Sequence, residues 1–314
     1  MKKVFLTGGN GFVGTALIKV LLKENIEVYA LCRNNEPKVD KNPLLHIIRG
    51  DLSDTSEIEK LVLPEFEEDD RIDVFYHLAW NGVQKEDKNN YEMQIKNITC
   101  GMNALKICDR LKCKRFVNSG TVAEYVACNG LINDIWSPSP NDIYGAAKVA
   151  SRYLMQAQAN ITYKIDFINT ILCSTYGEAR LDDNVISYTI KTLLQGEKPI
   201  YGSLQQMWDF LYVEDVARAF FLIGEKGLAG ETYSIGSGHY RHLKEYVCEI
   251  RDAIDPKLEL GIGVFQEKYS KVLNSCIDSY LLQRDTGFVP EYSFAQGIGK
   301  TIEWYRNNED LWKK

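Results

Sequence analysis

Apolar and polar positions alternate along the first half of the chain in blocks that predict strands and helices in turn. Short apolar runs bounded by polar residues or glycine are typical of buried strands, and they occupy residues 4–7, 26–31, 45–49, 73–78, 115–119 and 164–173. Segments with apolar residues three or four positions apart predict amphipathic helices at residues 11–24, 91–111 and 144–159. This alternation predicts an α/β fold with a doubly wound parallel sheet.

The alternation changes after Tyr176. Residues 181–184 read as a polar loop, residues 185–196 as a helix, and residues 234–238 as a glycine-rich turn. We therefore predict a sheet domain at residues 1–176 and a smaller C-terminal lobe at residues 177–314, with residues 209–221 returning to the sheet. The absence of a low-complexity linker from the sequence indicates an extended interface between the two parts, with a cleft where they meet.

Composition and charge narrow the class of protein. The chain has 314 residues and a formal net charge of -6, which gives no long-range attraction for nucleic acid or for an anionic membrane surface. The sequence contains no run of eighteen apolar residues, and only three residues separate Lys3 from Thr7, too few for a signal-peptide core. We expect no membrane span and a location in the cytoplasm.

The cysteines and histidines do not follow the spacing of a metal or redox site. Eight cysteines are scattered singly and no CxxC pair occurs, so reduced and mostly buried thiols are expected. His239 and His242 are three positions apart but lack acidic or cysteine neighbours with ligand spacing. The sequence therefore predicts no metal site.

The stretch TGGNGFVG places four glycines directly after the first predicted strand. It matches G-x-G-x-x-G and opens a predicted helix. Glycine lets the backbone approach a pyrophosphate, and the start of a helix offers free N–H groups. A tight turn that binds nothing is the alternative, but the strand–turn–helix context favours a Rossmann-type dinucleotide site. Its predicted members are Gly8, Gly11, Phe12, Val13 and Gly14.

The end of the second predicted strand indicates which dinucleotide binds. An acidic residue there would bind the ribose hydroxyls and select NAD. Cys32 and Arg33 stand in its place, and a guanidinium can pair with a 2′-phosphate. NADP is therefore favoured, with NAD as the alternative, unless Arg33 is only a solvated loop residue. Asp51 and Leu52, after the third strand, are expected near the adenine.

The stretch YGAAK begins a predicted helix and places Tyr144 and Lys148 on one helix face. A YxxxK pattern alone is common by chance, but it is more specific when it follows a dinucleotide fingerprint. An ammonium close to a phenol favours the ionised phenolate, so we expect the pKa of Tyr144 to fall towards neutral pH. Such a tyrosine is a candidate acid and base for an alcohol and its ketone.

With these motifs in view, the chain resembles the extended short-chain dehydrogenase/reductase family, in its nucleotide-sugar epimerase, dehydratase and ketoreductase branch. TGGNGFVG, GDL, HLA, FVNSGT, YGAAK and WDFLYVEDVARAF follow one another in the family order over nearly the whole chain. The resemblance implies that Thr121 hydrogen-bonds the reacting oxygen and that Tyr144 gives or takes its proton. It also implies that Lys148 holds the nicotinamide ribose and tunes Tyr144.

The same resemblance implies further site residues. The backbone at Leu78 and Ala79 would lie along the cofactor, and Asn97 would support the active-site helix. Trp80 would face the sugar, although a packing role is equally open. Asn184 and Trp208 are candidates for contact with the substrate, which the resemblance implies is a nucleotide-diphosphate sugar.

The chain departs from the family pattern at several positions. The 4,6-dehydratases of the family place Asp-Glu directly after the threonine as acid and base for water elimination. This chain has Val122 and Ala123 there, so dehydration is not expected. Two family arginines, one of which grips the diphosphate, are replaced by Trp208 and Ile171. By position, the remaining candidates for holding the diphosphate are Asn184, Arg180 and Lys191.

Three functions follow from these expectations. The favoured one is an NADPH-dependent reductase of a 4-keto nucleotide sugar, because Arg33 favours an exchangeable NADPH. The second is a C4 epimerase that passes through a transient 4-keto intermediate and keeps its NAD. The third is a dinucleotide-binding sensor without turnover, which the presence of Thr121, Tyr144 and Lys148 disfavours.

The resemblance also implies a homodimer. Members of the family often pair through the two long helices next to the catalytic strand, which here are residues 91–111 and 144–159. Met102, Leu105 or Met155 would then be partly buried between the two chains.

Overall fold

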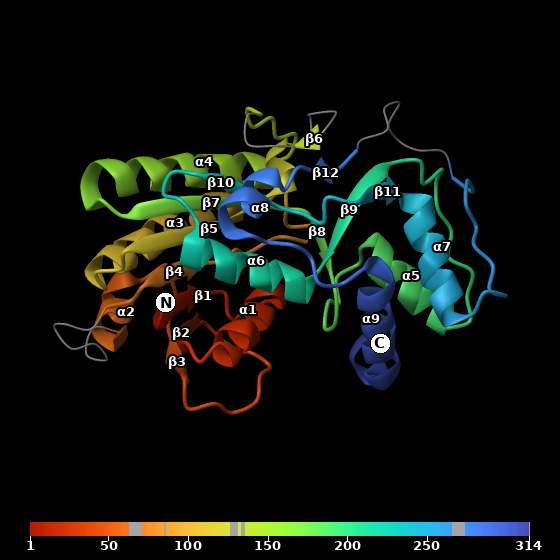
Figure 1. Ribbon diagram of the computed structural model, residues 1–314, viewed down its shortest axis with the longest axis horizontal. Helices are drawn as coiled ribbons and strands as arrows, with labels where there is room; N and C mark the ends of the chain where they lie inside the picture. The colour runs from red at the N-terminus through yellow and green to blue at the C-terminus, as the bar shows by residue number, and fades with distance from the viewer. Residues whose placement is uncertain (63–70, 85, 126–130, 133–135, 266–273, 314) are drawn as a thin grey trace.

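The computed structural model describes residues 1–62, 71–84, 86–125, 131–132, 136–265 and 274–313 (Figure 1). Among these residues, seven strands form one parallel sheet in the order β10-β7-β5-β4-β1-β2-β3. In chain order they are β1 (Lys3–Thr7), β2 (Glu27–Cys32), β3 (Leu45–Arg49), β4 (Val74–His77), β5 (Arg115–Thr121), β7 (Asp166–Leu172) and β10 (Thr232–Ile235). The predicted doubly wound parallel sheet is confirmed.

Helices cover both faces of this sheet (Figure 1). One face is covered by α1 (Phe12–Lys23) and α6 (Val213–Lys226), and the other by α2 (Thr55–Val62), α3 (Tyr91–Arg110) and α4 (Ile143–Gln158). Side chains on a strand point alternately to the two faces. Accordingly Val4 and Leu6 pack with the first pair of helices, whereas Phe5 packs with the second group.

A row of four phenylalanines crosses the centre of the sheet. The β-ladder aligns Phe5, Phe75, Phe116 and Phe167 on adjacent strands. Neighbouring rings stack with centroids 4.9, 5.2 and 5.8 Å apart, and all four side chains are buried. This row fixes the register of β5, which ends at Thr121, against the strands on either side of it.

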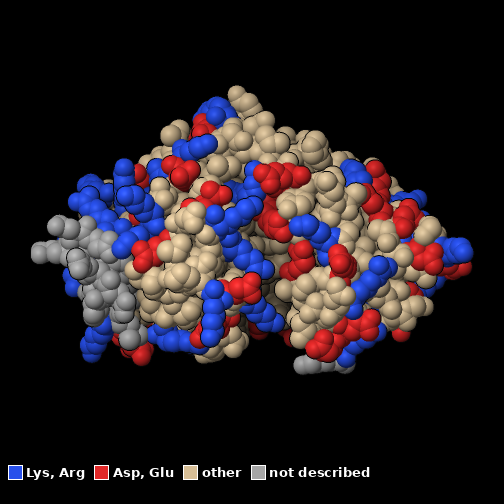
Figure 2. All heavy atoms as spheres, turned by 60° about the horizontal axis from the view of Figure 1, so that its bottom comes forward, with Lys and Arg blue, Asp and Glu red and all other residues tan. Residues whose placement is uncertain are grey.

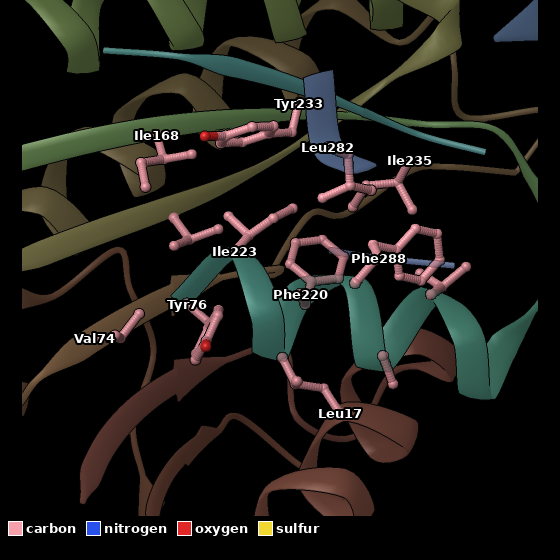
Figure 3. Packing of buried hydrophobic residues seen from close by; sticks show 14 of the residues in the cluster. Leu17, Val74, Tyr76, Ile168, Phe220, Ile223, Tyr233, Ile235, Leu282 and Phe288 are labelled. Atoms are coloured by element: carbon pink, nitrogen blue, oxygen red, sulfur yellow. The ribbon is translucent and has the colours of Figure 1, made fainter. Parts of the chain in front are cut away.

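The opposite face is filled mainly from α6. Figure 3 shows Phe220 and Ile223 on this helix lying between it and the strand residues Tyr233 and Ile235. On the other side of α6, Leu17 of α1 joins the same buried cluster. The last strand of the sheet is therefore held in place by a helix that precedes it in the chain.

A second, smaller part of the molecule has its own core. Its three-stranded sheet has the order β11-β9-β8, and its core combines aromatic side chains of the strands with mainly isoleucine side chains of the helices. The elements are β8 (Ser174–Tyr176), β9 (Met207–Tyr212), β11 (Tyr240–His242), α5 (Val185–Leu194), α7 (Leu243–Ile254) and α9 (Phe294–Asn307). The remaining elements are η2 (Val122–Tyr125), β6 (Leu131–Ile132), η3 (Ala159–Tyr163), β12 (Cys276–Ile277), α8 (Tyr280–Thr286) and α10 (Glu309–Trp312).

The chain returns to the large sheet after leaving it. The predicted turn at residues 234–238 is wrong for its first two residues, because Ser234 and Ile235 belong to β10 at the edge of the sheet. Tyr233 and Ile235 are fully buried there, which explains the strand. The segment 209–221 was expected to return to the large sheet. Its helical part, in α6, packs on that sheet, whereas its first residues belong to β9 of the three-stranded sheet. The domain boundaries at residues 176 and 177 stay a prediction.

Surface charge and thiols agree with an ordinary globular chain. Acidic and basic side chains are intermixed over the face shown in Figure 2. Every cysteine in the described part of the chain is a free thiol, and Cys128 lies outside that part. Among the described helices, none has both the length and the apolar character needed to cross a bilayer. The cytoplasmic location and the expected lack of nucleic-acid and membrane partners stay predictions.

The phenylalanine row yields a prediction for stability. Phe116→Ala should lower the free energy of unfolding by about 3–5 kcal/mol, because it removes a fully buried ring and leaves a cavity between two stacked neighbours. Urea unfolding followed by circular dichroism measures the change. Phe265, which is 50% exposed, is the matched control, and its replacement by alanine should stay within about 0.5 kcal/mol. A similar loss for both variants would contradict the role of the row.

Candidate active site

The predicted site residues meet at one edge of the large sheet. Parallel strands all present their carboxyl ends at the same edge, and ligands bind where the strand order reverses, here between β1 and β4. Gly8 follows β1, Arg33 follows β2, and Asp51 comes shortly after β3. Ala79 follows β4, and Thr121 is the last residue of β5. Positions far apart in the sequence are thereby brought to one edge.

The glycine turn is packed too tightly for side chains. Gly8 has a φ of +77°, and a Cβ atom on it would lie 2.6 Å from the backbone nitrogen of Ala79. A Cβ atom on Gly14 would lie 2.1 Å from the carbonyl oxygen of Gly8. Gly11 is the N-cap of α1 and makes no side-chain capping bond, which leaves the first-turn N–H groups of Phe12 and Val13 to face a ligand. These features fit the pyrophosphate of a dinucleotide.

Arg33 is engaged with neighbouring polar groups. Its Nη1 lies 3.8 Å from the carboxylate of Asp51, and its Nη2 donates to Asn81 at 3.2 Å. A hydrogen bond from the backbone of Ser53, aided by the charge of Arg33, lowers the pKa of Asp51 despite partial burial. Leu52 is buried, and its carbonyl accepts a bond from Asn103 of α3 at 2.7 Å. The adenosine end of the expected cofactor site thus carries both a cation and an anion.

Asn97 and Gln94 of α3 hold the segment that follows β4. Asn97 is buried and makes two bonds to the backbone of Asn81, of 3.0 and 2.8 Å. Gln94, which is also buried, accepts the indole N–H of Trp80 at 2.8 Å. These bonds place the Trp80 ring, which sequence reasoning left open between a packing and a substrate role. Its ring packs edge-on against Tyr144, with centroids 6.2 Å apart.

Thr121 and Tyr144 are brought together by a close approach of η2 and α4. Asp142 caps α4 by accepting the N–H of Gly145 at 2.6 Å. A Cβ atom on Gly145 would lie 2.3 Å from the carbonyl oxygen of Ala123, so a glycine is needed for this approach. This approach brings the Tyr144 phenol close enough to the Thr121 side chain for the latter to lower the pKa of the phenol.

Lys148 lies one helical turn further along α4 and is buried. Its ammonium donates to the carbonyl oxygen of Ser119 at 2.9 Å and lies over the ring of Trp80, 4.0 Å from the centroid. Burial lowers the pKa of Lys148 to about 8, and the negative charge of Glu124 partly opposes this shift. The amine therefore remains largely protonated at neutral pH.

The expected fall in the pKa of Tyr144 is wrong. Burial raises the pKa of the phenol to about 12, and the carboxylates of Glu124 and Asp142 act in the same direction, while the bond to Thr121 opposes them. The ammonium of Lys148 is directed at Ser119 and Trp80 instead of at the phenol. Tyr144 is therefore protonated at neutral pH.

The polar candidates on the smaller lobe are bonded within it. Asn184 caps α5 and accepts the N–H groups of Ile186 and Ser187, and the indole of Trp208 donates to Ser174 at 2.7 Å. Arg180 forms a bidentate ion pair with Asp182, with N···O distances of 2.7 and 2.9 Å. Lys191 donates to the carbonyl oxygen of Leu181 at 2.8 Å and to the carboxylate of Asp183 at 3.1 Å. The structure thus shows no contact between these side chains and the Thr121 group among the described residues.

Sequence reasoning missed the buried acid Glu124 and its partner near the site, the cation Arg152, whose side chain is 12% exposed. Glu124 is fully enclosed behind Thr121, and Arg152 lies on α4 at 3.5 Å from it. Two signals were present in the sequence: TVAE has the spacing of a capping box, and Arg152 lies eight positions after Tyr144 on the same helix face. Neither pattern by itself points to an active site.

Several relatives and solved structures cover almost the whole chain. The dTDP-glucose 4,6-dehydratase of Neisseria meningitidis serogroup B is 26% identical, over 100% of this chain and 96% of its own. A dTDP-glucose 4,6-dehydratase of Escherichia coli is 27% identical, over 99% and 96%.

Two solved structures illustrate the shared fold. The epimerase Mth375 of Methanothermobacter thermautotrophicus superposes with a TM-score of 0.86 at 20% identity, covering 99% of this chain and 94% of its own. DesIV, a dTDP-glucose 4,6-dehydratase of Streptomyces venezuelae with NAD and TYD bound, superposes with a TM-score of 0.84 at 24% identity, covering 99% of this chain and 99% of its own.

Residues 4–236 match the NAD dependent epimerase/dehydratase family. This range contains the glycine turn, Thr121, Tyr144 and Lys148, so the match covers both halves of the site at the sheet edge. The resemblance drawn from the motifs is confirmed. The chain belongs to the NAD dependent epimerase/dehydratase family.

Proposed function

We propose that the protein is an NAD(P)-dependent enzyme of nucleotide-diphosphate sugars that reduces the C4 ketone of a 4-keto sugar. The family is NAD dependent, and the relatives named above are a nucleotide-sugar dehydratase from each of two bacteria. The residues of this chain itself, and not its relatives, favour reduction of a ketone over the other reactions of the family.

The observation that supports reduction is the protonated phenol of Tyr144. Burial raises the pKa of this phenol to about 12 even though the Thr121 hydroxyl opposes the shift, so the phenol holds its proton at neutral pH. Reduction of a ketone requires a proton at the carbonyl oxygen, whereas oxidation of an alcohol requires a base in its place. A tyrosine in this state is therefore suited to donate.

The residues of the site divide the work between them. When bound, the reduced dinucleotide supplies the hydride. The Thr121 hydroxyl holds the ketone oxygen, and the Tyr144 phenol donates its proton to that oxygen as negative charge develops on it. The buried Lys148 lies on the same face of α4 as Tyr144, where its positive charge would orient the nicotinamide ribose of the cofactor. Trp80 and Tyr144 together exclude water from one side of the site.

Water elimination is disfavoured by the residues after Thr121. Val122 and Ala123 lie in η2, and neither side chain can give or take a proton. A dehydratase needs both an acid and a base at the sugar. The likeness to the 4,6-dehydratases therefore supports the substrate class and the cofactor more than the elimination step.

A C4 epimerase is the second candidate, and Arg33 favours it. The guanidinium is already paired with Asp51 and bonded to Asn81, so a 2′-phosphate would compete with a carboxylate for it. This arrangement suits NAD better than the sequence alone indicated. An epimerase requires tightly bound NAD that is reduced and then reoxidised within one turnover.

Tyr144→Phe tests the proton donor. The variant keeps the ring that packs against Trp80 and removes only the acidic hydroxyl, so turnover should fall roughly 10²–10⁴-fold with little change in cofactor affinity. Single-turnover oxidation of NADPH and NADH with a panel of 4-keto nucleotide sugars measures this.

Tyr280→Phe is the matched control, because Tyr280 lies on α8 and is 65% exposed. Wild-type rates in Tyr144→Phe would exclude Tyr144 as the donor. Interconversion of two sugars by the wild type without net use of the reduced cofactor would favour the epimerase. Binding of the dinucleotide with neither activity would favour the non-catalytic sensor.

Arg33→Ala tests the cofactor preference. If Arg33 binds the 2′-phosphate, the variant should weaken NADPH binding by roughly 1.5–3 kcal/mol, about tenfold to a hundredfold in Kd, and leave NADH nearly unchanged. Arg49→Ala is the control, since Arg49 is a neighbouring exposed cation paired with Glu36. Titration of each purified variant by fluorescence gives the affinities, and equal losses for both cofactors would show that Arg33 does not read the phosphate.

A homodimer is part of the proposal, but its expected contact residues need correction. Leu105 and Met155 are fully buried within the chain, so they cannot pack against a partner as predicted. Met102 is partly buried and packs against the hydrophobic cluster that contains Leu105 and Met155. The exposed apolar side chains of the two helices include Ile95 on α3 and Leu154 on α4, which are 57% and 51% exposed.

Leu154→Lys tests whether α4 lies in such an interface. In a dimer that pairs through α3 and α4, the variant should become monomeric at micromolar concentration, because a charge would be buried in an apolar contact. Analytical ultracentrifugation gives the mass. Leu228→Lys, at a position that is 50% exposed beyond α6, should leave it unchanged. A monomeric wild type would contradict the proposed dimer.

A further inference from the structure

A carboxylate lies buried directly behind the proposed reaction site. Glu124 is the third residue of η2, and its side chain is 0% exposed. Its Oε1 accepts the backbone N–H of Thr121 at 3.0 Å. Burial of an ionised carboxylate is costly unless cations and hydrogen bonds compensate for the lost water. The surroundings of Glu124 supply both.

A capping box explains only part of this arrangement. Thr121 precedes η2, its hydroxyl accepts the N–H of Ala123 at 3.3 Å, and Glu124 reaches back to its backbone N–H. That accounts for one carboxylate oxygen. The other oxygen faces Arg152 at 3.5 Å in a region closed to water, which a capping box does not require.

The backbone is shaped to admit the carboxylate. A Cβ atom on Gly120 would lie 2.6 Å from Oε1 of Glu124 and 2.1 Å from the carbonyl oxygen of Thr170. Any other residue at this position would displace β5, the carboxylate or both. The glycine directly before Thr121 therefore lets Glu124 pass close beneath the end of β5.

Two cations of α4 interact with this carboxylate: Arg152, whose side chain is 12% exposed, pairs with it, and the charge of the buried Lys148 acts on it. Tyr144, Lys148 and Arg152 are four positions apart, so they lie along one face of the helix. Arg152 also donates to Tyr125 and Thr232, at 3.1 and 2.9 Å, which fixes its guanidinium. The carboxylate thus pairs with one cation held in place by other bonds and lies within the electrostatic reach of a second.

We propose that Glu124 is a positioning residue for the Thr121–Tyr144–Lys148 site, whose carboxylate fixes the Thr121 backbone and keeps the Lys148 ammonium charged. This inference rests on the proposed function, in which Lys148 acts as a cation. Burial raises the pKa of Glu124 above its usual value, and the Thr121 N–H, Arg152 and Lys148 oppose that shift by favouring the ionised carboxylate.

The other titratable groups around Lys148 do not replace this counter-ion. His77 on β4 is neutral, because burial and the charge of Lys148 lower its pKa to about 3. Tyr144 is protonated, and Arg152 is a second cation. Tyr125, beside Arg152, has its pKa raised by burial and is protonated as well. Glu124 is the only negative charge that acts on Lys148 among the groups named here.

The test is a direct titration of Lys148 in the full chain. Lysine labelled with ¹³C at Cε reports its own pKa by nuclear magnetic resonance, and the Lys148 signal is assigned by its loss in Lys148→Met. In Glu124→Gln, which keeps an oxygen for the Thr121 N–H, the pKa of Lys148 should fall by about one unit or more. Glu59→Gln is the matched control, because Glu59 pairs with Lys106 and Arg110 on α3 and is away from α4. An unchanged Lys148 pKa in Glu124→Gln would overturn the proposal.

Activity supplies a second readout that a purely structural role would not move. With a Lys148 pKa about one unit lower, kcat/KM of Glu124→Gln at pH 8.5 should be about eight- to tenfold below wild type, and at pH 6 close to it. An equal loss at both pH values would show that Glu124 only supports the fold.

Glu124→Asp separates the two roles and serves if the glutamine variant does not fold. It keeps the charge but is too short to reach the Thr121 N–H, so the Lys148 pKa should stay near its wild-type value while turnover falls at every pH. A drop in the Lys148 pKa as large as that expected for glutamine would overturn the proposal. The titration needs no substrate, so it decides the role of Glu124 even if the chain proves inactive on nucleotide sugars.

Discussion

The backbone contact between the glycine turn and the end of β4 is the constraint on which the site depends. Gly8 and Ala79 approach so closely that a single Cβ atom would separate them, and Gly14 must lack one for α1 to begin beside the turn. This contact brings the start of α1 to the carboxyl end of β4. The segment after β4 is then held by Asn97 and Gln94, which place Trp80 against Tyr144 and Lys148. The cofactor turn and the proton donor are therefore parts of one rigid packing arrangement.

Burial governs the electrostatics of that arrangement. It raises the pKa of Tyr144 to about 12 and lowers that of Lys148 to about 8, so both groups hold their protons at neutral pH. A protonated phenol next to a protonated amine can donate to a ketone oxygen without first acquiring a proton from water. The arrangement costs stability, because two cations and a carboxylate must be kept from solvent. The glycines at positions 120 and 145 make room for the close approaches that compensate for it.

The fold could be predicted from the sequence, and so could the residues that the structure brings together at the sheet edge, because both depend on local patterns. Strand and helix periodicity, the glycine turn and YGAAK each lie within a few neighbouring residues. The misjudged features depend on contacts between distant segments. The direction of the Lys148 ammonium is set by Ser119 and Trp80, and the burial of Tyr144 by η2; neither is visible in a YxxxK pattern. The return of β10 to the sheet likewise depends on α6, not on the glycines that suggested a turn.

The smaller lobe is tied to the cofactor turn as well as to the large sheet. The guanidinium of Arg180 lies over the ring of Phe12, in the first turn of α1, with 5.5 Å to the centroid, while Asp182 holds it from the lobe side. A Cβ atom on Gly177 would lie 2.5 Å from Val213, the first residue of α6. Since α1 and α6 pack together on the sheet, the lobe meets the large domain at the first residues of these two helices, Phe12 and Val213. Arg180, one of the candidates for holding the diphosphate, also forms part of this junction, and its role towards a substrate stays a prediction.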